Sequence, residues 1–169
     1  PKLIKSTLSV ESEIENISNT FANAKGSMFL GRGFAYPVAM EGALKLKELC
    51  YVHAEGYPAG EMKHGPLALI EEGIPVVVLA PRDKYYEKTL SNMQEVISRG
   101  AKVLLISNKS KDEISSENVW KTIEVEKTSD ELLPFLLTLP LQILAFHSAK
   151  NKGYDIDKPR NLAKSVTVE

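Results

Sequence analysis

Three charged residues, Glu41, Lys45 and Glu48, stand at positions i, i+4 and i+7 of a segment with helical periodicity. At about 100° per residue, this spacing places them in one narrow stripe of a helix. A carboxylate beside an ammonium group can move a proton between adjacent carbons of a sugar, because the carboxylate takes and returns the proton while the cation stabilises the enediolate oxygen. Two solvated salt bridges, worth about 0.2–0.5 kcal/mol each, would have the same pattern. Spacing alone leaves both interpretations open.

A histidine is the second candidate for chemistry. His64 lies between polar residues and a Gly-Pro turn, in a long segment without helical or strand periodicity. Its imidazole titrates near neutral pH and suits acid–base work such as opening a sugar ring, although a plain surface histidine explains the pattern equally well. We expect His53 to be structural, and His147 to be a hydrogen-bonded core or interface residue. The histidines lack ligand spacing, so we predict no metal site and no cofactor.

A glycine turn, Gly31-Arg32-Gly33, follows a short apolar run and precedes a predicted helix. Open parallel sheets bind ligands beyond the carboxyl ends of their strands, glycine lets the backbone approach a ligand, and helix N-termini favour anions. Gly31, Arg32 and Gly33 are therefore candidate substrate-binding residues. Without a third glycine the turn is no dinucleotide fingerprint, and an ordinary strand–helix turn has the same sequence.

The elements that must position these groups alternate along the chain. We predict helices over Val10–Ala24, Tyr36–Cys50 and Asp83–Arg99, and strands over Met28–Leu30, Pro75–Ala80, Lys102–Ser107 and Thr122–Val125. Strands that alternate with helices indicate a mainly parallel sheet with helices on both faces. The sequence therefore predicts an α/β fold in one domain, residues 1–169, ending in a polar tail, residues 154–169.

Two segments are less regular. We predict that Tyr51–Pro66, which is rich in glycine and proline, is a long loop with short pieces of structure. In the apolar segment Leu132–Lys152 we predict two consecutive helices, because Pro140 interrupts the pattern and Thr138 can act as a new N-cap.

Composition excludes several classes of protein. Lys and Arg number 21 against 22 Asp and Glu, which argues against binding to nucleic acids or membrane surfaces. Cys50 is the only cysteine, which excludes an intrachain disulfide and indicates a reducing compartment. We see neither a membrane-spanning run nor a signal peptide, so we expect a cytoplasmic protein. Because the chain opens with Pro1, we expect either a processed or excised piece or a protein that has lost its initiator Met.

Several motifs together resemble the isomerase part of the glucosamine-6-phosphate synthase family, which consists of sugar-isomerase (SIS) domains. They are Gly-Arg-Gly (31–33), Glu-Gly-Ala-Leu-Lys-Leu-Lys-Glu (41–48), His-Ala-Glu-Gly (53–56), Gly-Glu-Met-Lys-His-Gly-Pro-Leu-Ala-Leu (60–69) and Asp-Lys-Pro-Arg-Asn-Leu-Ala-Lys-Ser-Val-Thr-Val-Glu (157–169). The resemblance implies a flavodoxin-like, three-layer αβα sandwich with a five-stranded parallel sheet. It also implies a ketose–aldose isomerase that turns fructose 6-phosphate into glucosamine 6-phosphate.

The resemblance assigns roles to matching residues. Glu48 would be the base that moves the proton between C1 and C2, and Lys45 would stabilise the charged intermediate with Glu41 nearby. His64 would assist ring opening and reach into the site of the partner subunit, which implies a homodimer. Lys164 would form a Schiff base with the open ketose phosphate. Ala163 and neighbouring tail backbone would line the pocket. Without the resemblance, the tail reads as an ordinary polar terminus.

Parts of the family's machinery are missing from this sequence. The complete enzymes carry an N-terminal glutamine-hydrolysing domain with a catalytic N-terminal cysteine, whereas Cys50 lies on the apolar side of a predicted helix. They also carry a first SIS domain with a Ser/Thr-rich loop for the sugar phosphate, and the nearest match here, residues 107–110, reads as a plain loop. We therefore expect the second SIS domain only, with little or no turnover alone.

Two other functions remain open at this stage. A stand-alone sugar-phosphate sensor or regulator would keep the pocket and need no Schiff-base lysine. A related sugar-phosphate isomerase or deglycase would act as a homodimer, but the tail motif would have no evident purpose in it.

Overall fold

The computed structural model describes residues 1–108, 110, 118–160 and 162. Its centre is a sheet of five parallel strands in the order β2-β1-β3-β4-β5. The strands are β1 (Gly26–Gly31), β2 (His53–Pro58), β3 (Pro75–Leu79), β4 (Lys102–Ser107) and β5 (Lys121–Glu124). This is the flavodoxin-like order, in which the direction of strand addition switches between β1 and β3.

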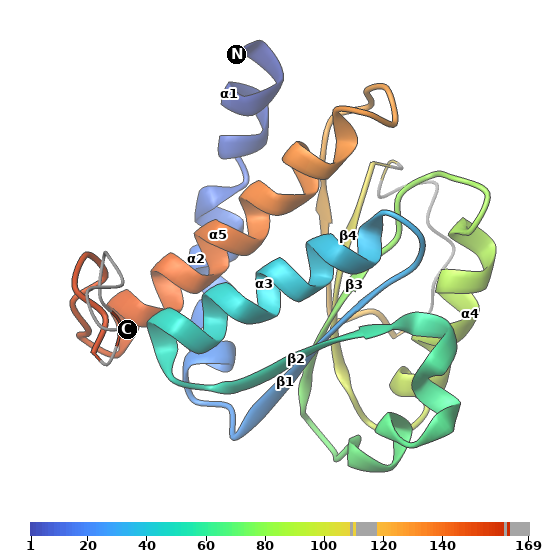
Figure 1. The fold of residues 1–169 in the computed structure, drawn as a ribbon, viewed down its shortest axis with the longest axis horizontal. Coiled ribbons are helices and arrows are strands. Elements are labelled where there is room, and N and C mark those ends of the chain that lie inside the picture. The colour runs from blue at the N-terminus through green and yellow to red at the C-terminus, as the bar shows by residue number, and fades with distance from the viewer. Residues whose placement is uncertain (109, 111–117, 161, 163–169) are drawn as a thin grey trace, which may run out of the picture.

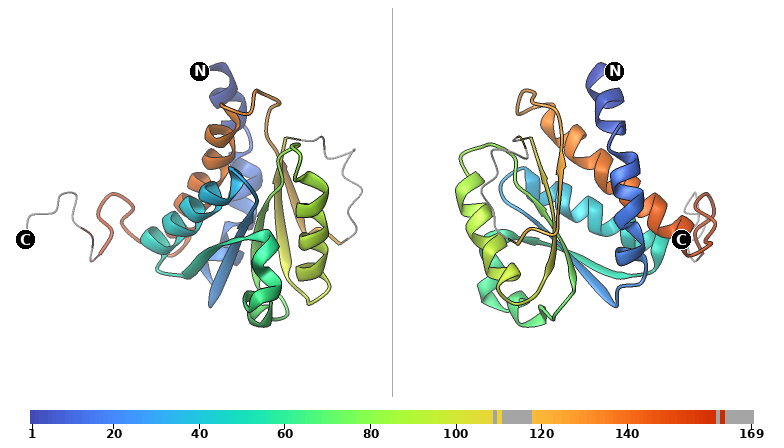
Figure 2. Two further views of the ribbon diagram at one scale, coloured as in Figure 1. Left: turned by 45° about the vertical axis from the view of Figure 1, so that its right-hand side comes forward. Right: turned by 180° about the vertical axis from the view of Figure 1, so that it is seen from behind.

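Helices cover both faces of the sheet (Figures 1 and 2). They are α1 (Lys2–Leu8), α2 (Glu11–Ala22), α3 (Ala35–Cys50), α4 (Tyr86–Ile97) and α5 (Leu133–Asn151), with the 3-10 helices η1 (Ala59–His64) and η2 (Pro66–Leu69). Helices α2, α3 and α5 pack on one face, and α4 and η1 pack on the other. The predicted three-layer αβα sandwich is therefore confirmed.

Alternate residues of the central strands supply two cores. Phe29, Val77 and Leu104 face α3 and α5, whereas Leu30 and Val78 face α4 and η1. All of these side chains are buried. Strands covered on both faces read as continuous apolar runs, which is why β3 and β4 were recognisable from sequence.

The prediction of a loop over Tyr51–Pro66 is wrong for its first half, which forms the edge strand β2. Its sequence, His-Ala-Glu-Gly-Tyr-Pro, has no apolar run because β2 lies at the rim of the sheet and pairs with β1 alone. Helix α3 crosses this strand closely: a Cβ added at Gly56 would lie 2.7 Å from the Cα of Met40.

The predicted break at Pro140 is also wrong, because α5 is one helix from Leu133 to Asn151 with Pro140 inside it. Thr138 does not cap a second helix; its hydroxyl donates to the carbonyl of Pro134 at 2.8 Å. A proline inside a helix costs about 3 kcal/mol. Burial of α5 against α2 and α3 offsets this cost, since ten of its residues, Pro140 included, are buried. The short helix α1 was not predicted.

Candidate functional site

Helix α3 carries the charged stripe of Glu41, Lys45 and Glu48. It begins directly after the glycine turn that ends β1 and runs back along the sheet (Figure 1). Its inner face is buried through Ala39, Ala43, Leu46 and Cys50. Because this face packs on the core, the charged stripe on the opposite face of α3 points away from the core.

The three charges of this stripe form one network. Lys45 Nζ lies 2.7 Å from Glu48 Oε2 and 3.8 Å from Glu41 Oε1. The side chains are partly buried: Lys45 is 30% exposed, Glu41 is 40% exposed and Glu48 is 29% exposed. The hydrogen bond to Glu48 raises the pKa of Lys45 above its usual range, so the ammonium group stays charged. A carboxylate held against a permanent cation can take a proton while the cation stabilises nearby negative charge.

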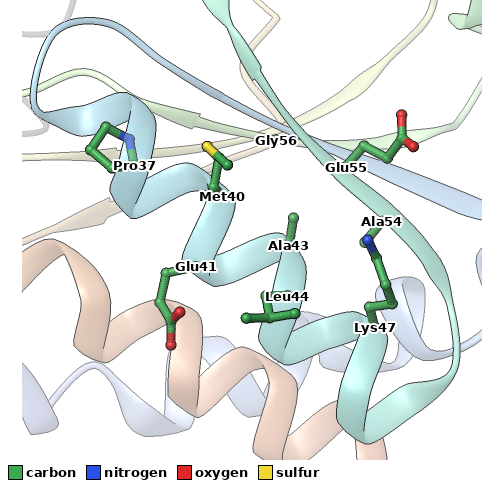
Figure 3. Close-up of a pocket in the computed structure, with 9 residues that line it drawn as sticks. All are labelled: Pro37, Met40, Glu41, Ala43, Leu44, Lys47, Ala54, Glu55 and Gly56. Atoms are coloured by element: carbon green, nitrogen blue, oxygen red, sulfur yellow. The ribbon is translucent and has the colours of Figure 1, made fainter.

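A groove of about 600 Å³ lies between α3 and β2, next to this stripe (Figure 3). Its lining residues are Pro37, Met40, Glu41, Ala43, Leu44, Lys47, Ala54, Glu55 and Gly56. Met40 extends from α3 toward β2, whereas the carboxylate of Glu41 points away from that strand. Glu41 thus belongs both to the groove lining and to the charged network. The groove was not predicted because β2 was not recognised.

The glycine turn lies at the carboxyl edge of the sheet, where we predicted it. A Cβ at Gly31 would stand 2.4 Å from the carbonyl oxygen of Ala35, and Gly33 has a φ of +54° beneath the ring of Tyr85. Both glycines are therefore required by local packing. Their binding of a substrate stays a prediction.

The side chain of Arg32 reaches across this edge to α4. Its Nε and Nη2 atoms both donate to Asn92 Oδ1 at 3.2 Å. The guanidinium group also underlies η1, since a Cβ at Gly60 would lie 2.4 Å from Arg32 Nη2. Arg32 thus joins β1, η1 and α4, and its predicted contact with substrate would come in addition to these bonds.

His64 ends η1 and faces solvent, with its side chain 75% exposed and Nε2 3.9 Å from Glu61 Oε2. The neighbouring Lys63 pairs with Glu95 of α4 at 2.9 Å, which links η1 to α4. Glu48 lies toward the far end of α3, about 20 Å along the helix from Ala35. His64 follows the carboxyl end of β2, so one chain does not bring the two side chains together.

The other two histidines differ from each other. His147 is buried on α5, and its Nε2 lies 3.1 Å from Glu11 Oε1, which confirms a hydrogen-bonded core residue. His53, which we expected to be structural, has a side chain that is 77% exposed and lies 3.5 Å from Glu55. Among the described residues, no three acidic, histidine or cysteine side chains cluster as metal ligands. No helix of the described chain is long and apolar enough to span a membrane.

Lys164 and Ala163 lie outside the described residues. The described part of the tail returns to α3: the backbone N–H of Arg160 donates to the hydroxyl of Tyr51 at 2.8 Å. Tyr51 follows the last residue of α3, three positions after Glu48. Neither Tyr51 nor Arg160 was singled out in the sequence, because their contact joins positions 109 residues apart.

The strand order and the helix layers define a three-layer α/β protein of the flavodoxin-like class. Within this class the chain belongs to the SIS domain family, whose profile matches residues 20–151. Over its whole length it is 49% identical to the glutamine–fructose-6-phosphate aminotransferase (isomerizing) of Bartonella quintana and 48% identical to that of Aquifex aeolicus. The chain spans 28% of the length of these relatives.

Solved structures agree with this assignment. The C-terminal domain of glucosamine-fructose-6-phosphate aminotransferase from Francisella tularensis superposes with a TM-score of 0.88 at 45% identity, over 93% of this chain and 44% of that one. Glucosamine-6-phosphate deaminase from Thermotoga maritima superposes with a TM-score of 0.67 at 26% identity, over 95% of this chain and 48% of that one.

Proposed function

We propose that this chain is the second SIS domain of a glucosamine-6-phosphate synthase and carries the proton-transfer and carbonyl chemistry of a ketose–aldose isomerase. Its substrate is fructose 6-phosphate and its product is glucosamine 6-phosphate. The observation that carries this proposal is the Lys45–Glu48 pair at 2.7 Å on the outer face of α3, in a chain 49% identical over its full length to an isomerizing aminotransferase.

The proposed chemistry divides among four side chains. The amine of Lys164 attacks C2 of the open ketose, and loss of one water gives an imine; ammonia then displaces the lysine amine and leaves an imine on C2. Glu48 removes a proton from C1 and returns it to C2, while Lys45 stabilises the negative charge that develops between these steps. The result is an aldehyde at C1 and an amine at C2. His64 assists ring opening.

The site we propose is completed by groups outside this chain. Because His64 is exposed and far from Glu48 within one chain, we propose a homodimer in which each His64 serves the opposite site. The phosphate grip and the nitrogen source would lie in a first SIS domain and a glutamine-hydrolysing domain. Gly31, Arg32, Gly33, Glu41 and Ala163 would contact the sugar phosphate or border its pocket. The single buried thiol, Cys50, fits a reducing compartment, and we place the protein in the cytoplasm.

A chimera tests the proposal directly. The 169 residues of this chain replace the matching segment of the Bartonella quintana relative, and glucosamine 6-phosphate formation from fructose 6-phosphate and glutamine is measured. We expect activity within about tenfold of the parent, and a borohydride-stable sugar adduct on Lys164. A folded chimera that binds fructose 6-phosphate but forms neither product nor adduct would favour a sugar-phosphate-binding regulator instead.

A further inference from the structure

Tyr51 ends α3 in an unusual conformation. Its φ of 57° and ψ of 28° lie in the left-handed region, which bulky side chains rarely enter. The backbone N–H of Tyr51 still donates to the carbonyl of Lys47 at 3.1 Å, so the helix closes normally before the chain turns away. Such strain persists where the surrounding contacts fix it, and the contacts of the Tyr51 ring show what does so here.

The ring of Tyr51 holds the tail at two points. The Tyr154 ring lies 4.9 Å from it, centroid to centroid, just after α5 ends. The Arg160 guanidinium lies 4.0 Å from the ring centroid, and the Arg160 backbone N–H donates to the Tyr51 hydroxyl. We call these three residues, Tyr51, Tyr154 and Arg160, the tail clasp. A cation over an aromatic face contributes about 0.5–1 kcal/mol at exposed sites, and the hydrogen bond adds to it.

The segment between Tyr154 and Arg160 turns back toward α3. The Asp155 carboxylate accepts the backbone N–H groups of Asp157 and Lys158 at 3.0 and 3.1 Å, which turns the chain back. Ile156, between them, packs against the core cluster of α2, α3 and α5. The tail therefore returns to the end of α3 that carries Glu48.

This return sets the length of the tether that carries Lys164. From Ile156, which packs on the core, eight residues lead to Lys164, whereas from Arg160 only four do. Four residues reach at most about 14 Å, and Tyr51 lies only about 4.5 Å along the helix axis from Glu48. Because effective concentration falls roughly as the −3/2 power of tether length, shortening the tether from eight residues to four raises it about threefold.

We propose that Tyr51 is a positioning residue that clasps the tail through Tyr154 and Arg160 and so delivers Lys164 to the sugar carbonyl beside Glu48. The inference rests on the proposed function. It adds a residue whose role is to present the Schiff-base lysine rather than to touch the substrate.

The test uses the chimera and follows the rate at which borohydride traps fructose 6-phosphate on Lys164. The variants Y51L and R160A should slow adduct formation about threefold. R160A loses only the cation over the ring, so its thermal midpoint should fall by no more than about 4 °C. R160K keeps a cation over the ring and should recover most of the rate. R99A, which removes an exposed arginine of the α4 terminus, is the matched control and should trap at the wild-type rate.

The outcomes separate the two proposals. Adduct formation at the wild-type rate in both Y51L and R160A would overturn the clasp and leave the proposed function standing. A wild-type chimera that forms no adduct at Lys164 would refute the proposed function, and the role of the clasp with it. A fall in rate matched by a fall in thermal midpoint, without recovery in R160K, would also refute positioning.

Discussion

The carboxyl edge of the sheet and the outer face of α3 both carry polar groups, and they use them differently. At the edge, Arg32 is bonded to Asn92 and the two glycines of the turn fit against neighbouring atoms. On α3, Lys45 pairs with Glu48 and with Glu41, and all three side chains remain partly exposed beside a groove. The edge is built to hold the fold together, and α3 presents its charges outward.

This difference separates two general arguments about where a ligand binds. The rule for open parallel sheets favours the edge at the β1–β3 switch. The chemistry of a carboxylate beside a cation favours the face of α3. Substitutions in the two regions should therefore have different effects. We expect substitutions on α3 to reduce catalysis and substitutions at the edge to reduce stability.

The largest effect should come from Glu48→Gln in the chimera. Removing a general base lowers kcat by about 10²–10⁴-fold, while the isosteric amide keeps the helix and its packing intact. Initial rates of glucosamine 6-phosphate formation give the comparison. Glu87→Gln, at an exposed position in the first turn of α4, is the control and should leave the rate unchanged. Near-normal turnover in Glu48→Gln would remove the base from α3.

Arg32→Ala should act mainly on stability. It leaves the amide oxygen of the buried Asn92 without its charged partner and opens a gap beneath Gly60, at a cost of about 1.5–3 kcal/mol. Urea denaturation measures this change. If Arg32 instead serves the substrate, as the sequence predicts, the KM for fructose 6-phosphate rises sharply while the free energy of unfolding barely changes.

Gly33→Ala should cost somewhat less. A left-handed alanine loses about 1–2 kcal/mol, and the Tyr85 ring, 2.8 Å from the new Cβ, must also shift. Gly153→Ala is the matched control, because Gly153 has a similar φ of +68° and no atom within 4 Å of its Cβ position. The difference between the two thermal midpoints isolates the contact with Tyr85. Equal midpoints would mean that the edge is looser than its packing indicates.

The smallest effect concerns Cys50, on the buried side of α3. Burial raises the pKa of its thiol to about 12. The unfolded thiol ionises near pH 8.5, so the contribution of the buried neutral form is complete below that pH and is lost as the pH rises toward 12. Raising the pH from 7 to 9 should therefore lower the free energy of unfolding of the wild type by up to about 1 kcal/mol relative to that of Cys50→Ala. Urea denaturation at both pH values checks this, and a constant difference would contradict it.

The sequence predicted those parts of the fold whose burial is reflected in local pattern. Strands β3 and β4 are apolar on both faces, and α2 and α4 have clear helical periodicity. Strand β2 was missed because an edge strand needs no apolar run. The continuity of α5 through Pro140 was missed because it depends on packing against α2 and α3.

The candidate site was predictable to a similar degree. Spacing placed Glu41, Lys45 and Glu48 on one face, and only the family resemblance raised them above ordinary salt bridges. The contact of Arg160 with Tyr51 was not predictable, since it depends on how the tail turns after α5. The groove depends on the same kind of long-range information, because one of its walls is β2.

The crossing of α3 over Gly56 has a consequence for the width of that groove. The separation between helix and strand is set by a missing methyl group, because a side chain at position 56 would meet the backbone of Met40. The size of the residue at position 56 therefore sets how closely α3 can approach β2. A larger residue there would push α3 away from β2 and move Glu41, Lys45 and Glu48 together, although none of these three residues is itself changed.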